Sequence, residues 1–168
     1  MGSEMCIRDR SRGVSLQGAT LKAGGSISIT GQHSPGATYA VALEAYAGTQ
    51  STLTAGTGIT LESLNNTVGT VQLGDATSLN GGSGDIVIKA AVIGTITSTS
   101  VRNLTTTGSI FLLPDADQTS FGEAVNTQYL NFANAAGLTI GGAGNTAAVT
   151  LGLSLIHISA PTRLLSIS

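Results

Sequence analysis

A short glycine-anchored pattern recurs along the chain and limits the folds open to it. In each copy a glycine is followed by apolar residues that alternate with others, as in Gly84-Asp-Ile-Val-Ile. The anchoring glycines are Gly25, Gly58, Gly84, Gly108 and Gly137, and the copies at Gly58 and Gly137 are one position shorter. Their spacing is irregular, with a mean of roughly 28 residues, which lies within the range of repeat architectures. Alternation with period 2 predicts β-strands, and its repetition at this spacing predicts a solenoid.

Further short runs show the same alternation and are bounded by Gly, Asn or Asp, which favour turns. Taken with the anchors, the expected strands are 26–30, 59–61, 70–73, 85–88, 95–97, 109–112, 138–140 and 149–151. The segment 39–47 has a composition that suits either a helix or a strand. One anchor strand with one or two shorter strands would make one coil of a parallel β-helix.

We therefore predict an all-β fold, a right-handed parallel β-helix of about five coils that is uncapped at both ends. Inward Ile, Leu and Val would form an apolar column, each coil burying its apolar side against its neighbours. Strand spacing alone does not separate this fold from an antiparallel β-sandwich or Ig-like repeats, which are the alternative.

The two ends of the chain differ in style from the repeats. Residues 1–10 read MGSEMCIRDR, and residues 153–163 read LSLIHISAPTR. Both resemble translated transposase adapter from sequencing libraries, because one orientation of that DNA encodes MGSEMCIRD and its reverse complement encodes LSLIHISEPT. The resemblance implies that 1–10 and about 153–168 are adapter-derived and carry no function. We expect 11–152 to be a β-solenoid fragment from the interior of a longer reading frame.

Charge and cysteine content exclude several function classes for the segment 11–152. It has four bases and seven acids, a net charge of −3, and the only cysteine of the chain, Cys6, lies outside it. A nucleic-acid partner needs a basic face, so we expect none. No apolar run reaches the length of a membrane span. A disulfide framework and a thiolate zinc site both need cysteines.

No residue of the chain is expected to act in catalysis or to bind a cofactor or a metal. His33 lies in Gly-Gln-His-Ser-Pro-Gly, which is turn chemistry, so we expect an exposed loop histidine. A polysaccharide-cleaving β-helix would need acids in register on neighbouring coils, for example Asp85 with Asp115 or Asp117. Because Asp115 and Asp117 follow Pro114 directly after an expected strand, a solvated turn is the expected place for them.

Two glycine-rich segments, 81–85 and 141–145, partly match the calcium-binding repeat Gly-Gly-x-Gly-x-Asp. Their sixth positions hold Ile86 and Thr146, and the two copies lie far apart in the chain instead of in tandem. We expect tight turns between strands at both places. The same holds for 56–58, which lacks the strand-to-helix context of a phosphate-binding loop.

The segments 54–61, 84–90, 137–141 and 149–152 resemble the repeat regions of filamentous-haemagglutinin-like and MBG-type bacterial surface proteins. The resemblance implies a β-helical shaft segment of a large exoprotein at the bacterial cell surface, structural and adhesive, without catalysis. It also implies a surface or glycan ligand for the parent protein, which would need an outer-membrane secretion partner. A β-helical polysaccharide-processing enzyme and a phage-type fibre segment are the alternatives.

Overall fold

The computed structural model consists of short parallel strands. It describes residues 12–32, 38–64, 69–95, 100–115, 118–152 and 166–167. Every ladder between the named strands is parallel, and these ranges contain no helix. The predicted all-β parallel solenoid is confirmed. The antiparallel alternative is wrong, and so is the possible helix at 39–47, where a strand forms.

Three sheets carry the fold. Sheet A contains β1 (Arg12–Gln17), β4 (Tyr39–Glu44), β7 (Thr70–Leu73) and β10 (Val92–Thr95), in that order. Sheet B contains β2 (Thr20–Ala23), β5 (Thr52–Ala55), β8 (Ser78–Asn80), β11 (Arg102–Thr105) and β14 (Leu130–Ala133). Sheet C contains β3 (Ile27–Gln32), β6 (Ile59–Leu64), β9 (Ile86–Lys89), β12 (Ser109–Leu113), β15 (Gly137–Ile140) and β17 (Ser166–Ile167).

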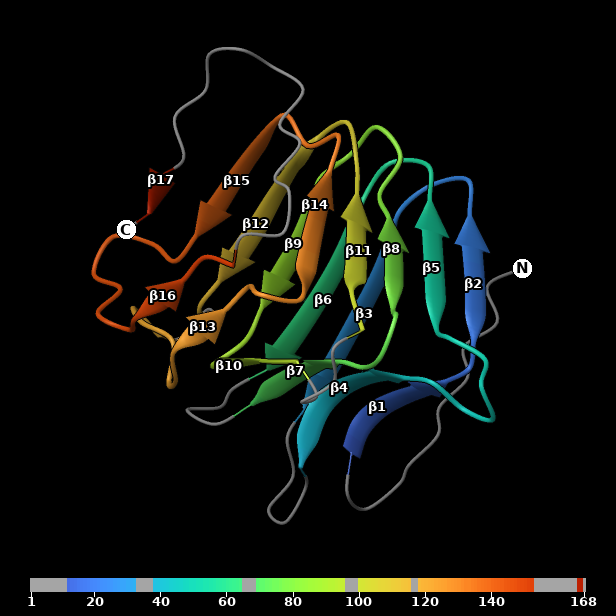
Figure 1. Ribbon diagram of the computed structural model, residues 1–168, viewed down its shortest axis with the longest axis horizontal. Coiled ribbons are helices and arrows are strands. Elements are labelled where there is room, and N and C mark those ends of the chain that lie inside the picture. The colour runs from blue at the N-terminus through green and yellow to red at the C-terminus, as the bar shows by residue number, and fades with distance from the viewer. Residues whose placement is uncertain are drawn as a thin grey trace.

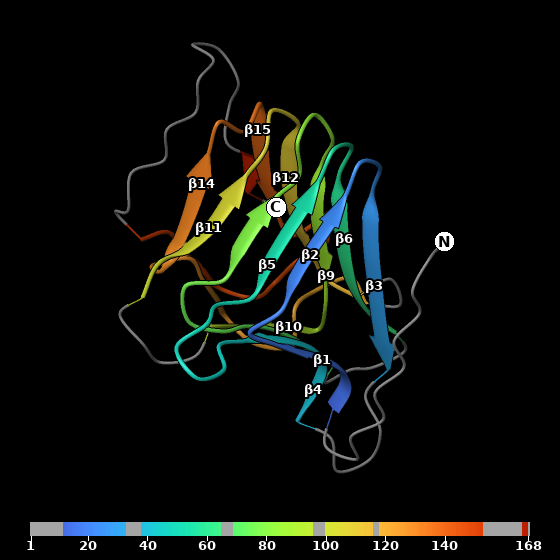
Figure 2. The ribbon, with the colours of Figure 1, turned by 90° about the vertical axis from the view of Figure 1, so that its right-hand side faces the viewer.

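Consecutive strands pass from sheet A to B to C, so each set of three strands makes one coil. Figure 1 shows the coils side by side, with the strands of sheet B running opposite to those of sheet C. Seen from the end that holds the first coil, sheets B and C meet along one edge and sheet A lies below them (Figure 2). Four coils contribute to all three sheets. A fifth contributes β14 and β15, while β13 (Val125–Asn126) pairs with β16 (Val149–Thr150) in a separate sheet.

The repeat is most regular in one inward-facing column of sheet C. This column contains Ile27, Ile59, Ile86, Ile110 and Leu138, each paired in register with the next. All five anchoring glycines therefore stand at the start of strands of the same sheet, four of them before the strand and Gly137 as the first residue of β15. In the shorter form of the pattern the glycine is adjacent to the residue of this column, as Gly58 is to Ile59 and Gly137 to Leu138. In the other three copies one residue lies between the glycine and the column residue.

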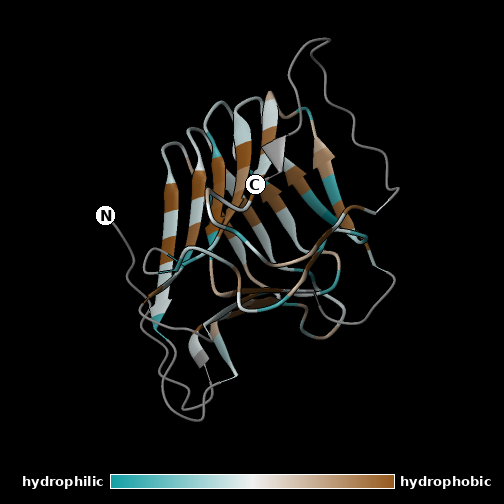
Figure 3. Ribbon diagram, turned by 90° about the vertical axis from the view of Figure 1, so that its left-hand side faces the viewer, coloured by the Kyte–Doolittle hydropathy of each residue, from teal (hydrophilic) through white to brown (hydrophobic). Residues whose placement is uncertain are grey.

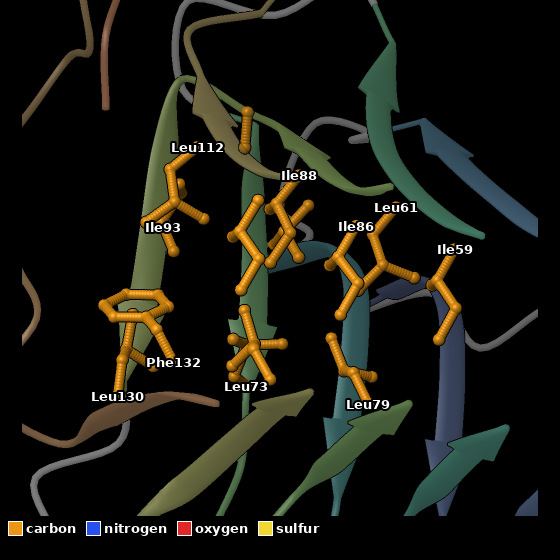
Figure 4. Close-up of a cluster of buried hydrophobic side chains, with 14 of the residues drawn as sticks. Ile59, Leu61, Leu73, Leu79, Ile86, Ile88, Ile93, Leu112, Leu130 and Phe132 are labelled. Carbon is orange, nitrogen blue, oxygen red and sulfur yellow. The ribbon is translucent and has the colours of Figure 1, made fainter. Parts of the chain in front are cut away.

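Inward side chains from the three sheets fill the interior of the stack. Hydrophobic bands alternate with pale ones along the strands (Figure 3), as expected when successive side chains point to opposite faces. Leu73 of sheet A, Leu79 of sheet B and Ile88 of sheet C are fully buried and lie in one cluster (Figure 4). Burying a side chain of this size contributes about 1.5–3 kcal/mol. The packing between coils is therefore the main stabilising term.

The corner between sheets B and C has an almost constant length. The connection from the inward column of sheet B to that of sheet C is equally long in the pairs Leu21–Ile27, Leu53–Ile59, Leu104–Ile110 and Phe132–Leu138. Only the pair Leu79–Ile86 is longer, by a single position.

Glycine makes this corner tight, because a Cβ on Gly84 would collide with the backbone carbonyl of Thr57 in the preceding coil. The segments that connect the other sheets vary more. The connection from Ile27 of sheet C to Val41 of sheet A is twice as long as the one from Ile86 to Ile93. The corner between sheets B and C is therefore the constrained edge of the stack.

The two ends of the stack differ. In the first coil, Leu16, Leu21 and Ile29 are only partly buried. At the other end Phe121 and Val125 are buried against the core, and β17 extends sheet C beyond β15 through two pairs of partners. Neither end is covered by a helix within the described ranges.

The predicted strands of sheet C are all confirmed, together with 70–73, and the predicted strand 149–151 forms at Val149–Thr150 as β16. The predicted strand 95–97 overlaps β10 only at Thr95, and residues 96 and 97 lie outside the described ranges. None of the strands of sheet B was predicted.

Candidate functional surface

The acids considered for a catalytic pair do not come together. Asp85 is exposed and directly precedes β9, whereas Asp115 follows β12 at the opposite end of the sheet C strands. Asp115 is buried, so the solvated turn predicted for it is wrong. One carboxylate oxygen of Asp85 accepts a hydrogen bond from the Ser109 backbone N–H at 2.8 Å, which gives this side chain a structural role at the corner. His33 and Asp117 lie outside the described residues.

The two glycine-rich segments form turns, as predicted. The segment 81–85 connects β8 to β9, and the segment 141–145 connects β15 to β16. Gly82, with a φ of 61°, donates its N–H to the side-chain oxygen of Asn80 at 3.0 Å. No group of three His, Cys, Asp or Glu residues within the described part of the chain could hold a metal ion.

A column of buried polar side chains lies where sheet A passes into sheet B. Ser51 and Thr77 directly precede β5 and β8, and Arg102 begins β11, so the three occupy equivalent positions on successive coils. The Ser51 hydroxyl lies 2.6 Å from the Glu44 carbonyl and 3.0 Å from the Leu16 carbonyl. Donating to such carbonyls satisfies backbone groups that the bend between sheets removes from the ladders.

Arg102 is the largest member of this polar column and is fully buried. Its Nε donates to the carbonyls of Leu73 and Gly74 at 3.2 and 3.1 Å, and its Nη1 donates to the Ser100 carbonyl at 2.6 Å. The Nη2 atom lies 3.0 Å from an Asp75 carboxylate oxygen. The guanidinium therefore joins the third coil to the fourth.

Burial lowers the pKa of the Arg102 guanidinium below its ordinary value, because desolvation outweighs the opposing effects of Asp75 and then Tyr129. The charged form is thus less favourable in the folded protein than in water. Asp75 is partly exposed, with 43% of its side chain accessible, so it neutralises the guanidinium incompletely. This site holds the corner together and offers no open position to a ligand.

The outer face of sheet B carries ladders of uncharged polar groups. One outward column contains Thr20, Thr52, Ser78, Asn103 and Asn131, and the next contains Lys22, Thr54, Asn80, Thr105 and Ala133. The amide nitrogen of Asn131 donates to the amide oxygen of Asn103 at 2.9 Å. Neighbouring rungs of a sheet lie about 4.8 Å apart, and alternate residues of a strand lie about 6.6 Å apart. The result is a regular array of hydroxyl and amide groups with one basic residue and no acid.

Sheet C presents a less polar outer face. Its central outward column contains Ser28, Thr60, Val87, Phe111 and Thr139. Beside this column the ammonium of Lys89 lies 3.7 Å from a Glu62 carboxylate oxygen. The polar ladders of sheet B are therefore the better candidate for contact with a hydroxyl-rich ligand, because they offer both donors and acceptors.

Within the described residues, no helix has the length and apolar character needed to cross a membrane. In comparisons with family models, curated proteins and solved structures, nothing matches this chain.

Proposed function

We propose that the chain is a structural and adhesive shaft segment of a large bacterial surface exoprotein, as its sequence resemblance implies. One observation carries the proposal: ladders and buried columns run without interruption through consecutive coils of sheets B and C. A stack of this kind lengthens by adding coils, each of which contacts only its neighbours. Such a stack can hold other parts of a protein at a fixed distance from each other and offers a long lateral surface, and a shaft requires both properties.

The adhesive part of the proposal rests on the outer face of sheet B. Hydroxyl and amide groups in regular rows can exchange hydrogen bonds with a glycan without the cost of desolvating a charge. A surface or glycan ligand fits this chemistry, and the bacterial cell surface is the proposed location. The separation of Asp85 from Asp115 supports binding without cleavage over the enzyme alternative.

Pulling the chain from its two ends in a force spectrometer tests the structural role. If coils separate one at a time, each event releases roughly 30 residues, and about 3.4 Å per extended residue gives steps of roughly 100 Å. A single event that releases the whole chain at once would mean that coils are not the mechanical units, and would contradict the proposal.

Co-sedimentation with insoluble polysaccharides, followed by an assay for new reducing ends, tests the adhesive role. We expect binding without cleavage, and weaker binding by the double variant Asn103→Ala with Asn131→Ala. A matched control is Thr60→Ala with Thr139→Ala on the outer face of sheet C, which should bind as the wild type does. Release of reducing ends that Asp85→Asn abolishes would instead establish the enzyme alternative.

A further inference from the structure

Exposed apolar side chains stand at the edge of sheet B that adjoins sheet A. Within the described ranges three large hydrophobic side chains are exposed, those of Tyr46, Leu64 and Val101. Val101 directly precedes β11, and Tyr46 lies in the connection from β4 to β5, which projects beside the lower end of sheet B in Figure 2. Two of the three therefore border the polar ladders, and tyrosine is a residue that binding surfaces favour.

A tight turn holds Tyr46 in place. Its backbone exchanges two hydrogen bonds with Thr49, at 2.9 and 2.8 Å, and the residues between them, Ala47 and Gly48, have φ values of 49° and 79°. Positive φ at both central residues is typical of a type I′ turn. The Cβ of Tyr46 lies 3.3 Å from the place that a Cβ on Gly18 would take. Tyr46 therefore stands beside the start of the first sheet B strand on a fixed backbone, although 66% of the residue is exposed.

A second tyrosine stands at the other end of the same edge. Tyr129 directly precedes β14 and is partly buried, and its carbonyl accepts the N–H of Arg102 at 2.9 Å. It therefore follows Val101 along the stack. Thr20 and Asn131 are the first and last members of the adjoining polar column, so the two tyrosines border this column near its two ends.

The outer face of sheet B is longer along the stack than along its strands. Sheet B has five strands, and at about 4.8 Å between neighbours they span about 19 Å. The strands themselves have only three or four residues, a length of about 10–13 Å. An extended ligand therefore makes most contacts when it crosses the strands, one coil after another.

The charges at this surface favour a neutral ligand. Lys22 is the only charged residue of the two outward columns. Asp75, at the edge of the third coil, lies 3.0 Å from the Arg102 guanidinium. A ligand with many carboxylates or sulfates would lose water from these groups without gaining partners, which is costly. Hydroxyl groups, in contrast, can exchange hydrogen bonds with the Thr, Ser and Asn side chains of the ladders.

We infer that the outer face of sheet B binds a neutral, linear, β-1,4-linked polysaccharide that lies across the strands, with one sugar on each coil. The inference rests on the proposed function, because it names the ligand class of the adhesive face. In an extended glycan of this linkage the sugars repeat at close to the strand spacing of about 4.8 Å, so successive sugars meet equivalent groups on successive coils. Sugar rings also have apolar C–H faces, which can pack on Tyr46, Val101 and Tyr129, and buried aromatic side chains of this kind often dominate the binding energy of an interface.

Isothermal titration calorimetry of the full chain with cello-oligosaccharides of increasing length tests this inference. We expect the affinity to rise roughly twofold to tenfold with each added sugar, up to the five strands of sheet B, because each sugar adds hydrogen bonds. Malto-oligosaccharides have an α-linkage that curls the chain, and oligomannuronate has the β-linkage but carries carboxylates, so both should bind at least about tenfold more weakly. Absence of binding by the cello-oligosaccharides, equal affinity for the α-linked series, or an affinity that stops rising at the disaccharide would overturn the inference.

Replacement of the two tyrosines identifies the path of the glycan. Tyr46→Ala and Tyr129→Ala should each weaken binding of the longest oligosaccharide at least about fivefold, whereas Tyr129→Phe keeps the ring and should bind as the wild type does. The matched control Phe111→Ala removes a ring from the outer face of sheet C and should leave binding unchanged. Because Tyr46 is 66% exposed, Tyr46→Ala should stay folded by far-UV circular dichroism even if Tyr129→Ala does not.

The same variants separate failure of this inference from failure of the proposed adhesive role. If Asn103→Ala with Asn131→Ala weakens binding to insoluble polysaccharide while folded Tyr46→Ala binds every oligosaccharide as the wild type does, the adhesive face remains and the inferred path along its edge is wrong. If none of these variants changes binding to any glycan, the outer face of sheet B is not the adhesive surface, and both proposals fail.

Discussion

Replacement of Arg102 tests how the buried polar column contributes to stability. Arg102→Ala leaves a cavity beside the core and removes the donor from three carbonyls and from Asp75. Because Asp75 is 43% exposed, its carboxylate is not left buried without a partner, so the cost of Arg102→Ala comes from the cavity and from the carbonyls left without a donor, about 2–5 kcal/mol. Arg102→Leu removes the same charge but fills the space, and leucine is already the residue at the equivalent position of the next coil, Leu130.

The expected difference between the two replacements follows from the lowered pKa of Arg102. A base whose pKa is lower in the folded than in the unfolded protein destabilises the fold while it is protonated; this cost begins to fall as the pH rises through the folded pKa and is gone only above the unfolded pKa. At neutral pH the guanidinium is protonated in both states, so the full cost is present and leucine avoids it. We expect Arg102→Leu to unfold within about 2 kcal/mol of the wild type, the loss coming from the carbonyls left without this donor.

Urea unfolding at neutral pH, followed by far-UV circular dichroism, measures these differences. Asp75→Asn serves as the companion variant: because Asp75 is 43% exposed and asparagine still offers an acceptor, its cost should be at most about 1 kcal/mol. The reasoning is refuted if Arg102→Leu is as destabilising as Arg102→Ala, since filled volume would then not matter. It is refuted also if Asp75→Asn costs as much as either.

Two further pairs of variants test the packing and the corner. Leu104→Ala removes a fully buried side chain from the middle of the stack and should cost about 2–5 kcal/mol in urea unfolding; Leu21→Ala at the partly exposed first coil should cost clearly less, and equal costs would mean that the interior is not continuous. Gly84→Ala brings a Cβ against the Thr57 carbonyl, whereas nothing lies within 4 Å of a Cβ at Gly24. The first should lower the melting temperature and the second should leave it nearly unchanged, and the opposite order would contradict the arrangement of the corner.

Sheet C was predictable from the sequence because its strands bring two apolar residues to the core. In β9, for example, Ile86 and Ile88 alternate with two partly exposed residues and follow a glycine turn. Sheet B gives a weaker signal, since β8 is only Ser78-Leu79-Asn80 and buries one leucine between two polar residues. Only β14, with Leu130 and Phe132, brings two large apolar residues to the core, so most of the sheet B register becomes visible only when neighbouring coils are aligned.

Two features were not predictable from the sequence, for different physical reasons. A charged residue is almost never fully buried unless it is paired, so nothing in the residue pattern indicates burial of Arg102. Its partners, apart from Asp75, are backbone carbonyls, whose places no residue pattern reveals. In β4, residues 40–43 are all buried, which removes the alternation that identifies a strand with one exposed face. The composition of that segment therefore suited a helix equally well.

The constant corner between sheets B and C has a consequence for how such a chain changes during evolution. Adding one residue to a strand would turn its apolar side chains outward, and among the five coils the tight corner differs in length by only one position, between Leu79 and Ile86. The connections into and out of sheet A already absorb differences in length between coils, and lengthening a surface loop costs little free energy. Insertions should therefore accumulate along the two edges of sheet A. For the same reason, a peptide inserted near Tyr46, which is 66% exposed, should be tolerated. The corner between sheets B and C keeps the strands in register, while the connections on either side of sheet A can change in length and sequence.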